Sequence, residues 1–166
     1  DPQEGAMAVL MDKLGERLAF ERSGTRLYDA LLVKCETLDG GIPMKALQHT
    51  PDEEPPHFAL LGPAIQSLGG DPTQQTPCAN VSGVEGMGLM QVLTDPKTTL
   101  GQALHAILVA EMTDNAGWEE LIMLTEQAGN DDLVKRFAKA RDEELEHLEK
   151  VQAWYKQATM KQMQET

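Results

Sequence analysis

The feature that most constrains this chain is an internal repeat with a fixed offset. Residues 52–58 (DEEPPHF) match residues 142–148 (DEELEHL), and residues 18–31 match residues 108–121, each 90 positions further along without a gap. Within each copy, a lone glutamate precedes a Glu-x-x-His motif by 33 residues, Glu21 before Glu54 and Glu111 before Glu144. The repeat therefore predicts two copies of one structural unit, packed about a pseudo-twofold axis.

Helical periodicity places each copy on a pair of helices. Apolar residues recur at steps of three and four, which keeps them on one helix face. We predict helices at about 6–37, 43–68, 98–128 and 131–158 in a single domain spanning residues 1–166. Residues 69–97 form the connection, which is rich in Pro, Gly, Thr and Asn, with one short helix near 87–93. The expected fold class is all-α: an antiparallel four-helix bundle made of two helical hairpins joined by a long crossover.

Six polar residues interrupt the apolar seams of these helices. They occupy positions where leucine would be expected: Glu21, Glu54, His57, Glu111, Glu144 and His147. Four carboxylates in one core are costly, because buried like charges repel and lose their hydration. No lysine or arginine shares the seams to neutralise them, whereas two divalent cations would. This mixed oxygen and nitrogen donor set favours Fe or Mn and also accepts Zn.

Bulk composition limits the partners. The net charge of −13 argues against nucleic acid and against anionic membrane surfaces, because both need clustered Lys and Arg. The two cysteines form no CxxC pair, which indicates a reducing compartment without a disulfide framework. With no apolar run near the roughly 20 residues of a membrane span and no visible signal peptide, we expect a cytoplasmic protein.

The motif set resembles the ferritin-like di-iron carboxylate superfamily, especially rubrerythrin and bacterioferritin, whose sites use one Glu from each of two helices and Glu-x-x-His from each of the other two. The resemblance implies two metal ions, Fe first, with Glu21 and Glu111 as the lone ligands. It further implies an oxidoreductase that reduces O2 or peroxide, either rubrerythrin-like or a ferroxidase. A hydroxylase uses the same ligands. The alternative is a non-catalytic protein that holds or stores Fe, Mn or Zn.

Three departures from that family shape the expectations. No rubredoxin module is present, so the electron donor is open, and the sequence also allows a homodimer. Bacterioferritins bind haem through a Met beside the second-helix Glu, where this chain has Pro55, so no haem is expected. Pro55 and Pro56 cannot donate backbone hydrogen bonds. We therefore predict that Glu54 and His57 are held less rigidly than Glu144 and His147, and that the nearer metal binds more weakly.

Several neighbouring residues have simpler interpretations. Tyr28 and Trp118, two turns from the lone glutamates, are interpreted as core packing rather than as a radical or proton relay. Asp114 is interpreted as a polar face residue rather than a spare ligand, and His49 and His105 as surface residues.

Overall fold

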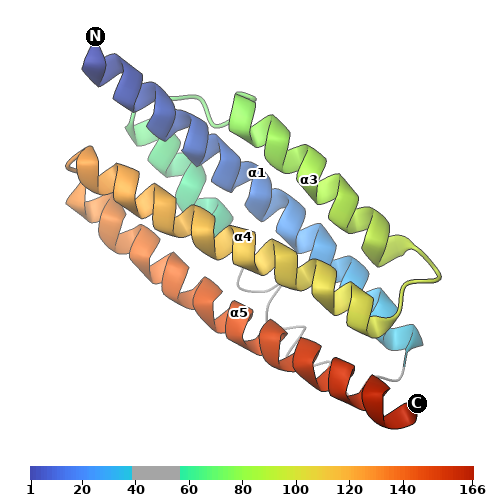
Figure 1. The fold of residues 1–166 in the computed structure, drawn as a ribbon. Coiled ribbons are helices and arrows are strands. Elements are labelled where there is room, and N and C mark those ends of the chain that lie inside the picture. Colours follow the sequence, from blue (N-terminus) through green and yellow to red (C-terminus); the bar gives the residue numbers. More distant parts are fainter. Residues whose placement is uncertain (39–56) are drawn as a thin grey trace.

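The computed structural model describes residues 1–38 and 57–166, and these are all-α as predicted (Figure 1). The helices with defined bounds are α1 (Pro2–Thr37), α3 (Pro77–Thr94), α4 (Leu100–Gln127) and α5 (Asp131–Glu165). A further helical segment covers residues 57–67. The predicted second helix from residue 43 lies outside the described residues over its first part.

The helix ends follow from local chemistry. The side chain of Asp1 accepts a hydrogen bond from the backbone N–H of Gln3 at the start of α1. Thr99 and Gln102 form a reciprocal capping box at the start of α4, and Asn130 caps α5. The turn between α4 and α5 passes through Gly129 at φ 73°, a left-handed conformation that glycine adopts without steric cost. These features explain why α4 and α5 form a tight antiparallel hairpin.

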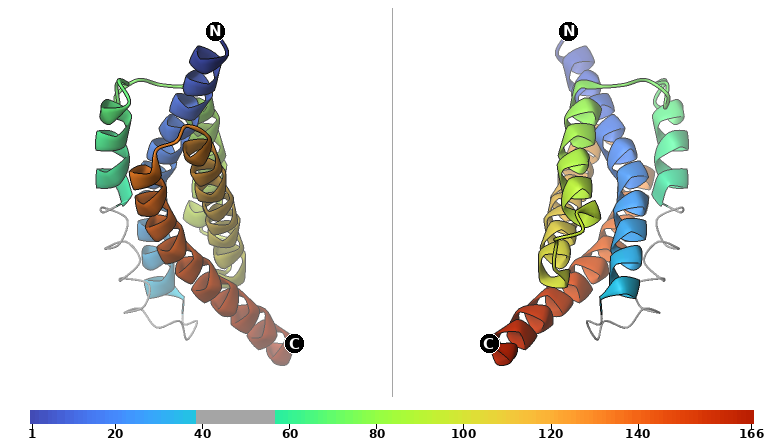
Figure 2. Two further views of the ribbon diagram at one scale, coloured as in Figure 1. Left: turned by 90° about the vertical axis from the view of Figure 1, so that its left-hand side faces the viewer. Right: turned by 90° about the vertical axis from the view of Figure 1, so that its right-hand side faces the viewer.

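The crossover differs from the prediction. Instead of a short helix near 87–93, it contains α3, an 18-residue helix that packs on both α1 and α4 (Figures 1 and 2). Helix propensity does not predict the full length of α3, because the segment contains glycines and each glycine costs about 1 kcal/mol in a helix interior. The start signal was present, since Thr76 caps the helix and Pro77 occupies its first turn. Helix α5 also continues to Glu165, seven residues beyond the predicted end at 158.

The start of α3 is attached to α1 by Asp12. The backbone N–H of Cys78 donates to Asp12 Oδ1 at 2.9 Å, and the Thr76 hydroxyl donates to the Asp12 carbonyl at 3.2 Å. Burial raises the pKa of Asp12, but the hydrogen bonds from Cys78 and Thr76 outweigh it and hold that pKa below its usual value. Gly15 allows this approach, because a Cβ there would stand 2.6 Å from Thr76 Oγ1.

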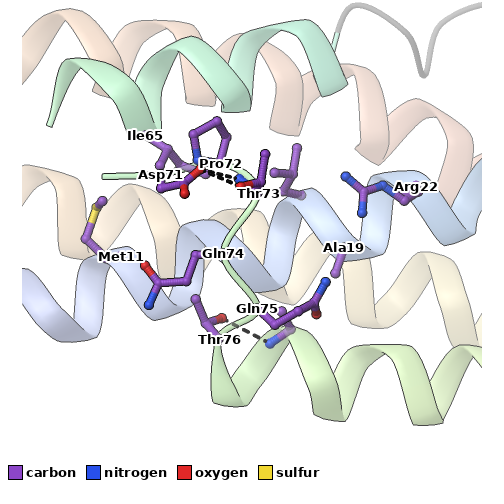
Figure 3. A pocket seen from close by; sticks show the side chains of 13 residues that line it. Met11, Ala19, Arg22, Ile65, Asp71, Pro72, Thr73, Gln74, Gln75 and Thr76 are labelled. Carbon is purple, nitrogen blue, oxygen red and sulfur yellow. Dashed lines mark hydrogen bonds between the residues drawn. The ribbon is translucent and has the colours of Figure 1, made fainter. Parts of the chain in front are cut away.

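The loop that precedes α3 closes a small crevice against α1. Residues 71–76 cross over α1 near Met11, Ala19 and Arg22, and leave a cavity of about 50 Å³ (Figure 3). Asp71 stiffens the loop by accepting hydrogen bonds from the backbone and the hydroxyl of Thr73, at 2.9 and 2.7 Å. The loop is therefore fixed just before α3 begins at Pro77.

Two clusters of buried apolar side chains flank the middle of the bundle. One contains Leu14, Leu18 and Phe137, and the other contains Leu31, Ile107 and Val151. On α1 the boundary between them falls at Glu21, on α4 near Glu111 and on α5 near Glu144. The buried polar residues therefore lie where the two apolar clusters meet. Among residues 1–38 and 57–166, every helix is too short or too polar to serve as a transmembrane span.

Candidate metal centre

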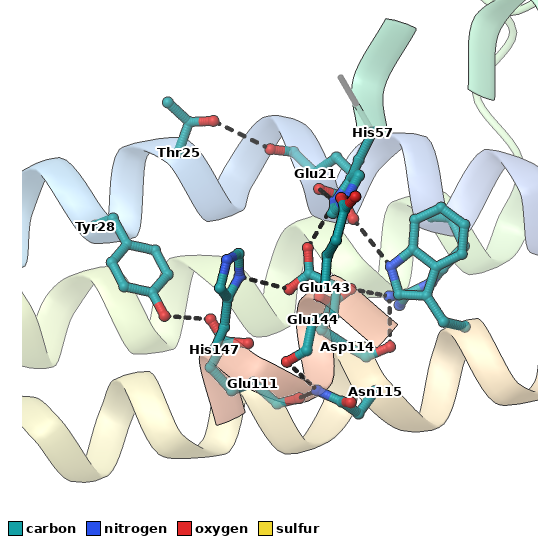
Figure 4. A network of polar contacts seen from close by, with 12 residues as sticks. Glu21, Thr25, Tyr28, His57, Glu111, Asp114, Asn115, Glu143, Glu144 and His147 are labelled. Carbon is teal, nitrogen blue, oxygen red and sulfur yellow. Dashed lines mark hydrogen bonds and ion pairs between the residues drawn. The ribbon is translucent and has the colours of Figure 1, made fainter. Parts of the chain in front are cut away.

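Five of the six predicted ligands converge at this junction. Glu21 comes from α1, His57 from the segment 57–67, Glu111 from α4, and Glu144 and His147 from α5 (Figure 4). Each is 3% exposed or less. The sixth, Glu54, lies outside the described residues, as does His49. Glu111 and Glu144 belong to adjacent antiparallel helices, whereas Glu21 reaches the same point from the other half of the repeat.

The five side chains form two groups that share one carboxylate. Glu21, His57 and Glu144 each bring a ligand atom within 4.8 Å of the others, and so do Glu111, Glu144 and His147. Glu144 Oε1 lies 2.7 Å from His57 Nδ1, while its Oε2 lies 3.1 Å from His147 Nδ1. The two oxygens of Glu144 thus face the histidines of different halves. A carboxylate in this position can bridge two metal ions.

Each lone glutamate accepts a hydrogen bond from an aromatic residue of the other half. Trp118 Nε1 donates to Glu21 Oε1 at 3.2 Å, and the Tyr28 hydroxyl donates to Glu111 Oε1. Tyr28 and Trp118 are themselves 90 residues apart, so the two bonds are equivalents under the repeat. Both side chains also pack in the apolar clusters, as predicted. Their hydrogen bonds to the glutamates were not predicted, although Tyr28 and Trp118 occupy equivalent positions of the repeat.

A buried ion pair lies beside the first group. Arg17 Nη1 donates to Asp114 Oδ1 at 2.6 Å, and both side chains are nearly inaccessible. The guanidinium also stacks on Phe20 at 4.8 Å and lies against Gly117, where a Cβ would be 2.3 Å from Arg17 Cζ. Asp114 is therefore neither a surface residue nor a free ligand. The prediction of no cation near the seams was also wrong, because Arg17 is fully buried in the core.

His57 is held from outside the cluster as well. Its Nε2 lies 2.6 Å from Glu143 Oε2, and the side chain of Glu143 is 38% exposed. With Nε2 bonded to Glu143, Nδ1 is directed at Glu144. A cavity of about 250 Å³ adjoins this contact, with Leu60, Arg136 and Lys139 in its wall. This cavity brings solvent close to one histidine of an otherwise buried cluster.

The donor set fits a pair of divalent cations. Arg17 is the one buried Lys or Arg in the described ranges, and its ion pairs at 2.6 and 3.5 Å are with Asp114 and Glu16 rather than with the predicted ligands. Three buried carboxylates beside two imidazoles therefore remain, and cations in each group would offset their charge. Carboxylate and imidazole donors in this mixture suit Fe, Mn or Zn. The arrangement is consistent with a di-metal site.

Comparison with known proteins supports the fold. No protein-family model matches the chain, and no curated protein matches its sequence. A crystal structure described as ferritin like, diiron-carboxylate proteins from Bacillus anthracis str. Ames is similar, with a TM-score of 0.67. The match covers 90% of this chain and 97% of that one at 19% sequence identity. The ferritin-like helical bundle predicted from the repeat is confirmed.

Proposed function

We propose that this chain is a di-iron carboxylate oxidoreductase that reduces O2 or peroxide at the buried cluster. The observation that carries the proposal is the shared Glu144, whose two oxygens face two histidines related by the repeat. A single structural metal would need one closed set of ligands, whereas this arrangement supplies two sets joined by one carboxylate.

The ligands divide between the two positions. Glu21 and His57 would hold one ion, Glu111 and His147 would hold the other, and Glu144 would bridge them. Glu54 completes the set by the sequence repeat. These residues would hold ferrous ions, which would supply electrons to the oxidant, and a separate reductant would restore the ferrous state.

The surrounding residues perform three tasks. The two apolar clusters exclude bulk water, which strengthens every charge interaction inside. Trp118 and Tyr28 each fix one oxygen of a lone glutamate, and the other oxygen of Glu21 lies 3.9 Å from His57 Nδ1. Glu143 fixes the ring of His57, and the cavity beside it is large enough to admit a molecule the size of O2 or peroxide.

The test combines metal content with turnover. We expect iron-loaded protein to contain two metal ions per chain and to consume peroxide or O2 when supplied with a reductant. Glu144→Gln should lose metal and turnover together. Glu146→Gln is the matched control, because Glu146 lies on the same helix but faces outward. Turnover that persists unchanged in Glu144→Gln would refute the proposal.

The same experiment separates the non-catalytic alternative. A protein that stores or holds Fe, Mn or Zn would bind two ions through the same residues but would not turn over oxidant. Metal binding without peroxide or O2 consumption would therefore replace the oxidoreductase with a storage role. Anomalous scattering above and below the iron edge would identify the metal in a crystal.

A further inference from the structure

A second cavity lies apart from the metal centre, between α1, α3 and α4. Its volume is about 290 Å³, and its lining is mostly apolar. Phe20 and Leu27 contribute from α1, Leu89 from α3, and Ala110 from α4. Polar atoms enter from α3 through Ser82 and Glu85. The cavity exists because α3, which is longer than the short helix predicted near 87–93, covers this side of the bundle.

The cavity and the metal cluster lie on different faces of the same two helices. Phe20 and Ala110 line the cavity, while the residues that follow them, Glu21 and Glu111, enter the cluster. Consecutive residues on a helix point about 100° apart. The cavity lining and the two ligand groups therefore share no residue, and the cavity is treated as distinct from the metal cluster.

Size and lining define the class of ligand. An engineered apolar cavity of about 150 Å³ is known to bind benzene, and this one is about twice as large. Two fused or linked rings fit such a volume. Aromatic and aliphatic walls with a few polar groups are typical of sites for small organic molecules.

The charge of the cavity lining indicates which small organic molecules would bind. Glu85 is the only charged residue in the lining and the only one in α3, and it is exposed at the cavity. The whole chain carries a net charge of −13, which also disfavours anions. We propose that the cavity between α1, α3 and α4 binds a flat apolar molecule of about two rings that bears an ammonium group facing Glu85.

The first test uses 2-naphthylmethylammonium as the probe and two glycines of α3 as matched positions. Gly86 lines the cavity, whereas a Cβ at Gly83 would meet no atom within 4 Å and Gly83 lies outside the lining. Both Gly→Leu changes raise helix propensity equally. Calorimetric titration should show binding weakened by at least about tenfold in Gly86→Leu, and within about twofold of the unaltered chain in Gly83→Leu.

The second test changes the charge. The unaltered chain should bind 2-naphthylmethylammonium more tightly than 2-naphthoate, an anion with the same ring system. Glu85→Gln should reduce the affinity for the ammonium probe by about threefold, as expected for one partly exposed ion pair. It should leave naphthoate binding unchanged or slightly improved. Equal binding of the two probes would overturn the assigned ligand class.

Three further outcomes would overturn the site itself. The first is no binding of the probe to the unaltered chain up to about 1 mM, and the second is equal probe affinity for Gly86→Leu and Gly83→Leu. The third is a sedimentation coefficient that rises with protein concentration and falls only in Gly86→Leu, because a second copy of the chain would then occupy this surface. These measurements do not depend on turnover, so they stand or fall separately from the oxidoreductase proposal.

Discussion

Glu21 and Glu111 occupy equivalent positions of the 90-residue repeat, yet their surroundings differ. Each accepts a hydrogen bond from an aromatic side chain of the other half, Trp118 or Tyr28. A buried ion pair breaks this equivalence. The Arg17–Asp114 ion pair lies on the Glu21 side, whereas the positions equivalent to Arg17 and Asp114 are Ile107 and Gly24.

Features that follow the repeat are those that a di-metal site would require twice, whereas the ion pair occurs in one half of the repeat only. The predicted ligands and their aromatic donors follow the repeat, as two equivalent metal positions would require. The Arg17–Asp114 ion pair does not follow it. We therefore expect symmetric effects from substitutions in the cluster and asymmetric effects from substitutions around it.

The largest effect should come from the ligand that belongs to both halves. Glu144→Ala removes the carboxylate shared by the two groups and should abolish binding at both metal positions. His57→Ala and His147→Ala should each abolish only one, because each histidine belongs to one group. The metal-to-protein ratio after dialysis measures all three. One metal retained in Glu144→Ala would show that the carboxylate does not bridge.

The ion pair should give the next largest effect, on stability rather than on metal content. Asp114→Ala removes the buried 2.6 Å partner of the Arg17 guanidinium and leaves the longer ion pair with Glu16 at 3.5 Å, and breaking a buried pair typically costs about 3–5 kcal/mol. Replacing both residues with apolar ones, Arg17→Met with Asp114→Leu, should recover most of that loss. At the position equivalent to Arg17, Ile107→Val should cost only about 0.5–1.5 kcal/mol.

Chemical denaturation of the metal-free protein measures these free energies of unfolding without interference from ligand binding. A double variant as unstable as Asp114→Ala would mean that the loss comes from packing and not from the uncompensated charge.

The two halves of the repeat also show which features of the fold and the site could be predicted from the sequence. The repeat and the seam positions predicted the fold, and the structure brings together five of the six predicted ligands; their role in metal binding stays a prediction. The same repeat implied that Tyr28 and Trp118 face Glu111 and Glu21, but the seam pattern alone could not distinguish a packed aromatic ring from a packed donor. Glu54 and the effect of Pro55 and Pro56 lie outside the described residues, so that asymmetry also stays a prediction.

Other features of the structure could not be predicted from the repeat, because they have no counterpart in its other half. Arg17 and Asp114 have no counterparts 90 residues away, and each alone is an ordinary charge on a helix. Their pairing depends on tertiary approach, which Gly117 permits by leaving room for the guanidinium. Helix α3 is likewise absent from the repeat, and its glycines conceal a helix that α1 and α4 stabilise by packing.

A smaller, symmetric effect is expected from the aromatic donors. Tyr28→Phe and Trp118→Phe each remove one hydrogen bond to a lone glutamate, and loss of such an outer partner typically weakens metal binding by about 10–100-fold. Tyr28→Phe should act on the position of Glu111, and Trp118→Phe on that of Glu21.

Measuring each change in the background that keeps only the affected position, His57→Ala for Tyr28 and His147→Ala for Trp118, isolates the two affinities. Trp154→Phe changes a buried tryptophan that is not among the predicted ligands or their hydrogen-bond donors, so it controls for loss of packing. If Trp154→Phe weakens metal binding as much as Trp118→Phe, the hydrogen bond is not the cause.

The smallest expected effect concerns Asn115 and Thr25, which are again equivalent under the repeat. Asn115 Nδ2 donates to the carbonyl of Glu111 at 2.9 Å and to that of Glu144 at 3.1 Å, so it joins α4 to α5 at the turn that carries the shared ligand. The Thr25 hydroxyl donates only within α1, to the Glu21 carbonyl at 3.4 Å.

Asn115→Thr, which copies the other half, should therefore cost about 1 kcal/mol, because a threonine hydroxyl bonds its own helix and cannot span to α5. Thr25→Ala should change stability by less than about 0.5 kcal/mol. Thermal unfolding resolves the first as a shift of about 2–4 °C, and equal shifts in both variants would show that the amide does not tie the two helices together.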